Sequence, residues 1–367
     1  MKILITGGHL SPAMAVIAEI GNKAEVIFVG RKFALDREKS YSLEFQEISR
    51  KQIPFYHLNT GRFTRLLNFK LIINFLKLPL GFYHALVILK KTKPDVILSF
   101  GGYIGFPICL IGFLINIPVY IHEQTIAPGL SNRLIGIFAK KVFLAFAQAK
   151  KYFPQNKTIV TGNPVRKNVL TIIKKPFFLE KNKPVIYFAG GSLGSHSLNK
   201  ILEKILPTLL LKYKIIHSTG NIREYADYRK LLELRNNLPE DLRNNYLLKE
   251  FFFEQELGFI YSISDLLVGR SGANTFFELI AWKKPAIFIP LPWSRSNEQL
   301  LHARLFQQAG TGEIFRQEED PNHFIILLEK VMKNINDYKK NFKNVELLYQ
   351  KNAEKIIVQT ILAAHYL

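Results

Sequence analysis

Short apolar runs that end in glycine, each followed by a helix-like segment, recur along this chain and constrain its fold more than any other feature. In the first part of the chain such runs cover residues 2–6, 24–30, 94–102, 117–123 and 139–146. They are apolar on both faces and are bounded by breakers, which is typical of parallel strands covered by helices on both sides. This part of the chain therefore predicts a doubly wound α/β domain.

The same pattern restarts after TGNPVR (161–166). Strand-like runs cover 183–192, 212–221, 264–272 and 284–292, and helical segments cover 198–211, 225–237, 273–282 and 299–309. We therefore predict an α/β fold of two doubly wound, Rossmann-like domains in tandem, with the boundary in the stretch 166–183. The expected domains are residues 1–165 and 166–345. The expected last element is a helix over 346–367 that packs back on the first domain.

Cysteine usage and hydropathy exclude several classes of protein. Cys109 is the single cysteine among 367 residues, so neither an intramolecular disulfide nor a cysteine-based zinc site is available, and a reducing cytosol is expected. The chain opens on an apolar strand without a basic leader, which argues against secretion. The longest apolar stretch, 108–121, is interrupted by Pro118 and falls short of the roughly 20 residues that a membrane-spanning helix needs. We expect a soluble or surface-bound protein.

The charge balance is strongly basic, with 50 Lys and Arg against 29 Asp and Glu and a net charge of +21. A surplus of this size predicts attraction to an anionic partner such as a phosphorylated ligand, an acidic membrane face or nucleic acid. A compositional bias toward Lys, Asn, Ile and Phe explains the same surplus without a binding role. Because zinc-finger spacing and RNA-recognition aromatics are absent from the sequence, no nucleic-acid partner is expected.

Glycines follow the predicted strands in both halves, at Gly7-Gly8, Gly101-Gly102, Gly190-Gly191-Ser192 and Ser271-Gly272. Ligands of such sheets bind at the carboxyl ends of the strands, where glycine lets backbone N–H groups approach a phosphate. A single turn of this kind is weak evidence, since tight turns need glycine in any case. Glycine-rich strand ends in both domains favour an enzyme that handles phosphate groups and two substrates.

Seven motifs occur in an order that points to one family: GGHLSPAMAV (7–16), PDVILSFGGYIGFP (94–107), IHEQTIAPGLSNRL (121–134), TGNPVR (161–166), AGGSLGSHSLN (189–199), HSTGN (217–221) and GRSGANTFFE (269–278). They resemble the motifs of the MurG family over nearly the whole chain, and the third is the most specific. Leu4 and Ile5 stand where that family usually has two further glycines, and Thr125 stands where it has asparagine.

The resemblance implies a GT-B fold, in which two Rossmann-like domains face a central cleft. It also implies inverting transfer of N-acetylglucosamine (GlcNAc) from UDP-GlcNAc to the C4 hydroxyl of MurNAc in lipid I, which forms lipid II for peptidoglycan. An enzyme of this kind works at the cytoplasmic face of the cell membrane as a peripheral protein.

The second domain is expected to hold the donor. Glu278 lies on a helix opened by Ser271-Gly272, and a carboxylate suits a ribose diol, which is also the role that the resemblance implies. An exposed helical glutamate is the alternative. The remaining donor residues implied by the resemblance are Gly191, Ser192 and Gly194 for the phosphates, Arg166 for the charge of the departing UDP, Glu298 and Gln299 for GlcNAc, and Phe253 and Glu254 for uracil.

The first domain is expected to hold the acceptor and the catalytic base. His9 follows the first strand, and an imidazole with a pKa near 6.5 suits deprotonation of an attacking hydroxyl. A helix-capping histidine is the alternative. Glu123 is the second catalytic candidate, because it can orient an imidazole or contact the acceptor sugar. The acceptor-binding candidates are Gly7, Gly8, Tyr103, His122, Gln124 and Thr125, with a purely structural role for His122 equally open.

Neither a metal ion nor another cofactor is expected. The sequence lacks a paired aspartate cluster that would suit Mg²⁺ or Mn²⁺, and the resemblance implies helix dipoles and arginine in place of a metal.

The segment 61–91 alternates basic residues with Phe, Leu and Ile. Such a composition suits an interfacial segment whose apolar side chains enter lipid while its cations meet anionic headgroups. A buried helix with a basic rim is the alternative. We expect the partners to be UDP-GlcNAc, lipid I and an anionic membrane surface.

Two rival functions remain. One is another GT-B glycolipid synthase that transfers a hexose to diacylglycerol. The other is a non-catalytic basic module that binds acidic lipid or RNA.

Overall fold

The computed structural model describes the chain except for residues 34–40, 62–68, 192–193, 221–223, 295–296 and 365–367, and it leaves out the side chains of residues 43 and 69–78 as well. The chain forms two compact units. The first unit is Met1–Pro164 together with Gln350–Leu367, and the second unit is Val165–Tyr349. The polypeptide therefore passes between the units twice, once next to the expected boundary at 165/166 and again after Tyr349.

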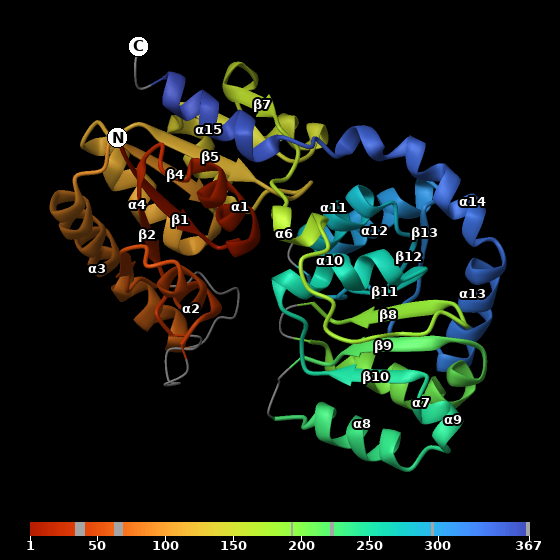
Figure 1. Cartoon of the computed structure of the whole chain (residues 1–367). Coiled ribbons are helices and arrows are strands. Elements are labelled where there is room, and N and C mark those ends of the chain that lie inside the picture. Colours follow the sequence, from red (N-terminus) through yellow and green to blue (C-terminus); the bar gives the residue numbers. More distant parts are fainter. Residues whose placement is uncertain (34–40, 62–68, 192–193, 221–223, 295–296, 365–367) are drawn as a thin grey trace. The chain divides into compact units, whose positions relative to one another are not determined.

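The first unit contains a seven-stranded parallel sheet in the order β3-β2-β1-β4-β5-β6-β7. The strands, shown in red to yellow in Figure 1, are β1 (Lys2–Gly7), β2 (Glu25–Gly30), β3 (Phe55–His57), β4 (Val96–Phe100), β5 (Val119–Glu123), β6 (Lys141–Leu144) and β7 (Thr158–Val160). Leu4 and Ile5 lie in β1 and are fully buried.

Helices cover both faces of this sheet because successive side chains of a strand point to opposite faces. The helices are α1 (Leu10–Ile20), α2 (Leu43–Arg50), α3 (Phe69–Thr92), α4 (Gly102–Leu114), α5 (Leu130–Phe138) and α15 (Ala353–Ala363), with 3₁₀ turns η1 (Ala147–Tyr152) and η2 (Gln155–Lys157). Leu4 of β1 belongs to a core with α3, α4 and α5, whereas its neighbours Ile3 and Ile5 belong to a core with α1, α2 and α15.

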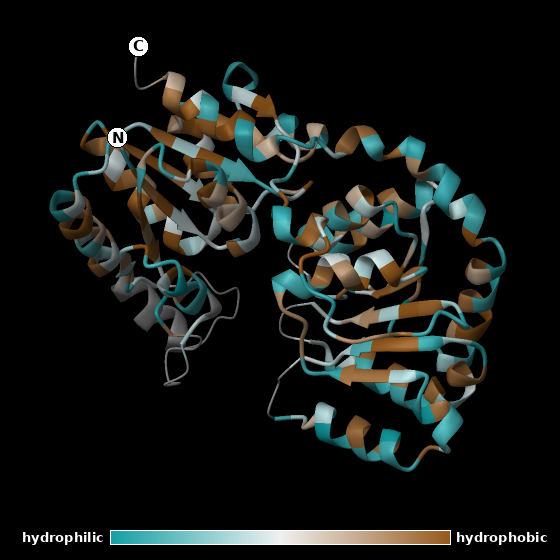
Figure 2. Cartoon of the chain, in the orientation of Figure 1, coloured by the Kyte–Doolittle hydropathy of each residue, from teal (hydrophilic) through white to brown (hydrophobic). Residues whose placement is uncertain are grey.

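The second unit contains a six-stranded parallel sheet in the order β10-β9-β8-β11-β12-β13. Its strands are β8 (Val185–Ala189), β9 (Lys214–Ser218), β10 (Tyr246–Lys249), β11 (Leu266–Gly269), β12 (Ala286–Phe288) and β13 (Gly312–Ile314). The strands of both sheets are mostly apolar along their length (Figure 2).

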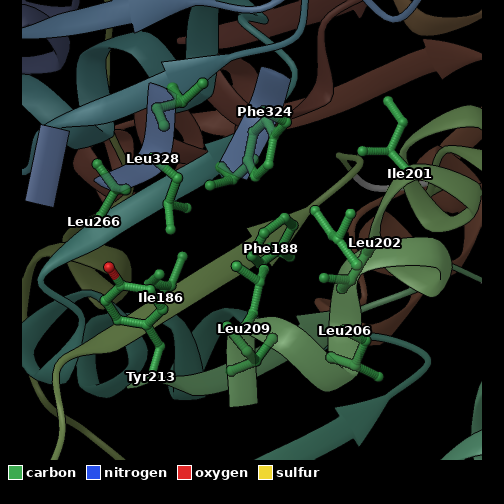
Figure 3. Packing of buried hydrophobic residues seen from close by; sticks show 14 of the residues in the cluster. Ile186, Phe188, Ile201, Leu202, Leu206, Leu209, Tyr213, Leu266, Phe324 and Leu328 are labelled. Atoms are coloured by element: carbon green, nitrogen blue, oxygen red, sulfur yellow. The ribbon is translucent and has the colours of Figure 1, made fainter. Parts of the chain in front are cut away.

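The helices of the second unit are α6 (Lys167–Leu170), α7 (His196–Lys212), α8 (Asp227–Asn236), α9 (Glu240–Arg243), α10 (Glu254–Ile263), α11 (Ala273–Trp282), α12 (Glu298–Gln308), α13 (Pro321–Lys333) and α14 (Ile335–Lys340), followed by the 3₁₀ turns η4 (Asn341–Asn344) and η5 (Glu346–Leu348). Figure 3 shows one of its cores, where Ile186 and Phe188 of β8 meet Leu206 and Leu209 of α7 and Phe324 of α13.

Each sheet has one point where the strand order reverses, between β1 and β4 in the first unit and between β8 and β11 in the second. Sheets of this type bind ligands at the carboxyl ends of the strands that flank this point. The topology therefore predicts ligand binding at the loops after β1, β4, β8 and β11. These loops carry the glycine motifs of the sequence.

Every strand and helix range that the sequence pattern predicts contains an element of that type, and the expected α/β class is confirmed. Of the helices in the described part of the chain, none combines the length and the apolar character required to cross a bilayer.

Candidate active site

The loops after β1 and β4 pack backbone against backbone. The N–H of Gly8 donates to the carbonyl oxygen of Gly101 at 2.9 Å, and a Cβ atom added to Gly8 would lie 3.1 Å from the Cα of Gly102. Gly101 and Gly102 have φ angles of 83° and 82°, which favour glycine. Any side chain at these positions would separate the two loops, so the glycines set the geometry of this strand end.

His9 is held at this strand end by a side-chain contact. It occupies the N-cap position of α1 but makes no side-chain capping hydrogen bond. Its Nδ1 instead lies 2.7 Å from Nε2 of Gln124, in the loop after β5. Burial lowers the pKa of His9 to about 4, so the imidazole is neutral at pH 7.

His122 lies on β5 and is buried. Its Nε2 is 3.3 Å from the carbonyl oxygen of Gly162. Burial lowers the pKa of His122 to about 4, while the contact with Gly162 acts in the opposite direction and the neighbouring His9 adds to the lowering. A neutral ring that donates Nε2–H to Gly162 ties β5 to the TGNPVR turn, which supports the structural alternative for His122.

Glu123 makes internal hydrogen bonds with both carboxylate oxygens. Oε1 accepts from the backbone N–H and the hydroxyl of Thr125, at 2.8 and 2.7 Å, and Oε2 accepts from Nδ2 of Asn132 at 2.8 Å. The side chain is buried. Asn132 in turn packs against Gly101, where an added Cβ would come within 2.8 Å of Nδ2. Glu123 thus fixes the loop after β5 against the loop after β4, and this geometry favours positioning over direct proton transfer.

Tyr103 lies next to these loops, in the first turn of α4. The guanidinium carbon of Arg31 lies 5.8 Å from the centre of the Tyr103 ring. The structure thus brings His9 and Gln124 into contact, and Glu123 and Thr125 as well, at one strand end of the first unit.

In the second unit, Arg166 and two carboxylates form one cluster. Nη1 of Arg166 lies 2.9 Å from Oε2 of Glu254, and its Nη2 lies 3.9 Å from Oε1 of Glu278. The other oxygen of Glu278 accepts a hydrogen bond from the Tyr261 hydroxyl at 2.7 Å. These groups come from the segment before α6, from α10 and from α11, so three separate segments converge.

Glu278 has an unusual environment for a carboxylate, because only 5% of it is exposed. Burial raises its pKa, the nearby Arg166 and the Tyr261 hydroxyl lower it, and Glu254 raises it. The oxygen that faces Arg166 at 3.9 Å keeps capacity to accept further hydrogen bonds. A buried carboxylate next to a cation suits a ligand with adjacent hydroxyl groups.

Gln299 lies near the loop after β11. Its side-chain Oε1 accepts from the N–H of Leu291 at 3.0 Å, and its carbonyl oxygen accepts from the Ser271 hydroxyl at 2.7 Å. Glu298 is the first residue of α12. Gln299 therefore contacts the Ser271-Gly272 loop, and the hydrogen bonds found in the described part of the chain do not connect it to the Arg166 cluster.

The loop after β8 carries the expected phosphate-binding glycines. Gly191 and Gly194 have φ angles of 89° and 83°. Ser192 lies outside the described residues. Phe253 is the exposed N-cap residue of α10, and its backbone N–H donates to the side chain of Glu256 at 2.9 Å.

Sequence reasoning missed two residues of these clusters, Asn132 and Tyr261, and also Arg270, a buried residue that follows β11 and donates hydrogen bonds to Ser195 and Ser197. Asn132 lies within the quoted block 121–134, Tyr261 lies on α10, and Arg270 lies within GRSGANTFFE, where the argument used only the serine and glycine. The signal for Arg270 was a basic residue directly after a buried strand. Tyr261 carried no signal of its own, because an aromatic residue on an amphipathic helix is most often part of a core.

The residues described do not include a group of three or more His, Cys, Asp or Glu placed to hold a metal ion. Metal independence therefore remains a prediction.

Comparison with known proteins defines the class. A model of the glycosyltransferase family 28 N-terminal domain matches residues 6–144, and a model of the family 28 C-terminal domain matches residues 185–361. The chain belongs to glycosyltransferase family 28.

Full-length relatives narrow the comparison further. A protein of Bacillus cereus named UDP-N-acetylglucosamine--N-acetylmuramyl-(pentapeptide) pyrophosphoryl-undecaprenol N-acetylglucosamine transferase 2 is 31% identical, over 98% of both chains. A protein of Clostridium perfringens with the same name, without the number, is 32% identical over 93% of this chain and 90% of its own. The resemblance to the MurG family is thereby confirmed.

Solved structures support the fold. MurG of Acinetobacter baumannii matches with a TM-score of 0.71 at 24% identity over 99% of both chains. A UDP-GlcNAc 2-epimerase of Neisseria meningitidis, solved with UDP-GlcNAc bound, matches with a TM-score of 0.68 at 21% identity over 99% of this chain and 100% of its own. At these identities the likeness concerns the fold alone, and it confirms the expected GT-B class.

Proposed function

We propose that this protein is an inverting N-acetylglucosaminyltransferase that moves GlcNAc from UDP-GlcNAc to the MurNAc C4 hydroxyl of lipid I and so forms lipid II. The observation that carries this proposal is full-length identity of 31% to a relative named for that reaction. The glycine-rich strand ends of both sheets support it, because each is suited to a phosphate group.

We assign the donor to the second unit. The Glu278 carboxylate accepts hydrogen bonds from the ribose hydroxyls, and Tyr261 and Arg166 hold it in place. Gly191, Gly194 and Ser192 approach the diphosphate, and Glu298 and Gln299 bind GlcNAc. Phe253 and Glu254 lie beside uracil. Arg166 offsets negative charge as UDP departs, although it already shares its own charge with two carboxylates.

We assign the acceptor to the strand ends of the first unit, at Gly7, Gly8, Tyr103, Gln124 and Thr125, with His9 as the general base and His122 in the structural role described above. A base must present an unprotonated ring nitrogen. When the Gln124 amide turns its oxygen to Nδ1, the His9 proton resides on Nδ1 and Nε2 is free to accept the proton of the attacking hydroxyl. The lowered pKa of about 4 keeps that nitrogen unprotonated at neutral pH. Glu123 is a positioning residue in this scheme.

We propose that the enzyme binds and acts at an anionic membrane surface, the cytoplasmic face of the cell membrane. Consecutive helices of the first unit, α3 with α4 and α4 with α5, pack against each other. They leave apolar side chains exposed, namely Leu80, Tyr83, Val87, Phe113, Leu114, Leu130, Leu134 and Ile137. Lys90 and Lys91 of α3 are exposed as well. Most side chains of the basic and apolar segment 61–91 lie outside the described residues.

Transfer assays with matched substrate pairs test the proposal. We expect product from UDP-GlcNAc with lipid I, and none from UDP-galactose with diacylglycerol. The reverse preference would favour the diacylglycerol glycosyltransferase. The non-catalytic alternative predicts binding that falls steeply with salt and no stabilisation by UDP. A rise in thermal midpoint with UDP contradicts it, because a ligand of the native state stabilises that state. Activity that survives a metal chelator checks the prediction of metal independence.

A further inference from the structure

Arg270 is a buried cation that the assignments above do not use. It follows β11 directly, at the point where the order of the second sheet reverses, and only 7% of it is exposed. The backbone there is tightly packed, since a Cβ atom added to Gly269 would lie 2.3 Å from the carbonyl oxygen of Ala189. Arg270 thus lies at the strand end where the topology predicts ligand binding.

Neutral groups supply all the hydrogen-bond partners that the structure gives Arg270. Nη1 donates to the carbonyl oxygen of Ile289 at 2.8 Å. Nη2 donates to the hydroxyls of Ser195 and Ser197, each at 2.7 Å, and to Oε1 of Gln317 at 3.0 Å. None of the ion pairs found among the described residues involves Arg270. Burial lowers the pKa of Arg270, and the negative charge of the exposed Glu318 opposes that lowering.

Arg166 provides the contrast. Its guanidinium lies next to the carboxylates of Glu254 and Glu278. The positive charge of Arg166 is therefore offset by ion pairs inside the protein, whereas Arg270 forms no ion pair among the described residues and, of their charged groups, interacts only with the exposed Glu318. Burying an uncompensated charge is costly, and an arginine remains protonated at neutral pH.

The partners of Arg270 lead to the glycine-rich loop after β8. Ser195 is the N-cap residue of α7 and accepts from the N–H of Leu198. A Cβ atom added to Gly190 would lie 2.4 Å from the nitrogen of Ser195, so this loop folds closely against the residue that Arg270 holds. Through Ser195 and Ser197, the guanidinium is thus hydrogen-bonded to the N-terminus of α7, where this loop ends.

We infer that Arg270 is a positioning residue that sets the affinity of the second unit for the diphosphate of a nucleoside diphosphate, through its uncompensated positive charge and without touching the ligand. A bound diphosphate supplies the negative charge that the buried guanidinium lacks. This inference rests on the proposed function, because it takes the second unit as the donor site.

The sharpest test keeps Arg270 and neutralises its charge. Gln317→Glu places a carboxylate at the position of an oxygen that already accepts from Nη2, so the hydrogen bonds are retained and an ion pair is added. We expect the variant to bind UDP about tenfold more weakly than the wild type does. The affinity for UMP should fall by a smaller factor, and the affinity for uridine should be unchanged. The thermal midpoint should be unchanged or higher. Isothermal titration with uridine, UMP and UDP measures the series.

Asn322→Asp is the matched control, because it adds the same charge to an exposed position on α13 of the same unit. It should leave the ratio of UDP to uridine affinity unchanged. Arg270→Gln removes the charge directly and should lower the ratio of UDP to uridine affinity. Arg270→Lys keeps the charge and should retain most of the wild-type ratio.

Equal losses for all ligands in Gln317→Glu, or an unchanged ratio of UDP to uridine affinity, would overturn the inference. If the wild-type protein itself fails to bind UDP, the proposed function fails instead, so the two failures are distinguishable.

Discussion

A carboxylate next to His9 should move the pH dependence of catalysis. In the wild type, burial lowers the pKa of His9 to about 4, and Gln124 is a neutral neighbour at 2.7 Å. Gln124→Glu puts a negative charge at that distance, which stabilises the protonated imidazole and raises the pKa by about 1–3 units. The acid limb of kcat/KM, which reports the free enzyme, should move from near pH 4 to between about pH 5 and pH 7.

The assay is the initial rate of GlcNAc transfer to lipid I at low acceptor concentration, from pH 4.5 to pH 8. Gln46→Glu is the control, because Gln46 is an exposed residue of α2 in the same unit and the variant carries the same added charge. An active Gln124→Glu enzyme with the wild-type acid limb would refute the assignment of His9 as the base.

The remaining predictions concern the base, the ribose ligand and acid stability. His9→Ala should lower turnover by about 10²–10⁴ while the rise in thermal midpoint with UDP persists, and wild-type turnover would remove His9 from the mechanism. Glu278→Ala should weaken UDP-GlcNAc binding by about 10–100-fold, through loss of charge-assisted hydrogen bonds, and an unchanged affinity in titration calorimetry would show that the ribose assignment is wrong. Burial lowers the pKa of His217 to about 3 and that of His302 to about 4, so the unfolded state binds more protons than the native state below pH 6.5. Acidification from pH 7 to pH 5 should therefore lower the unfolding free energy by about 2 kcal/mol for each of these two histidines. The variant His302→Gln should show about half of the pH dependence that the two histidines cause together. Urea unfolding followed by the fluorescence of Trp282 and Trp293, both in the second unit, measures it.

The strands that the sequence pattern predicts and those that it misses differ in position. β3, β7, β10 and β13 were not predicted, and each lies at the edge of its sheet. Most of their residues are only half-buried. An edge strand has a neighbour on one side only, so it does not need the continuous apolar run that marks a central strand such as β4. Length adds to this, since β3 spans only Phe55–His57.

The candidate site shows a similar division. Residues that follow a glycine-rich strand end, such as His9 and the Gly101-Gly102 turn, were predictable because the topology of parallel sheets fixes where such ends lie. Contacts between segments that are distant in the sequence were not predictable. Neither the ion pair between Arg166 and Glu254 nor the bond between Tyr261 and Glu278 has a sequence signature. The ion pair depends on how the segment before α6 packs against α10, and the hydrogen bond depends on how α10 packs against α11. Leu4 and Ile5, by contrast, continue the apolar run of the first strand in the sequence, and the structure places both as buried residues of β1.

The return of the last residues to the first unit has a consequence during synthesis. Ile357, Val358 and Ile361 of α15 complete a core with α1, so part of one face of the first sheet stays uncovered until α15 has been synthesised. At about 5–20 residues per second, residues 165–349 take about 10–40 s to emerge. During that time the second unit can fold to completion, while the part made first waits with an apolar surface open to chaperones.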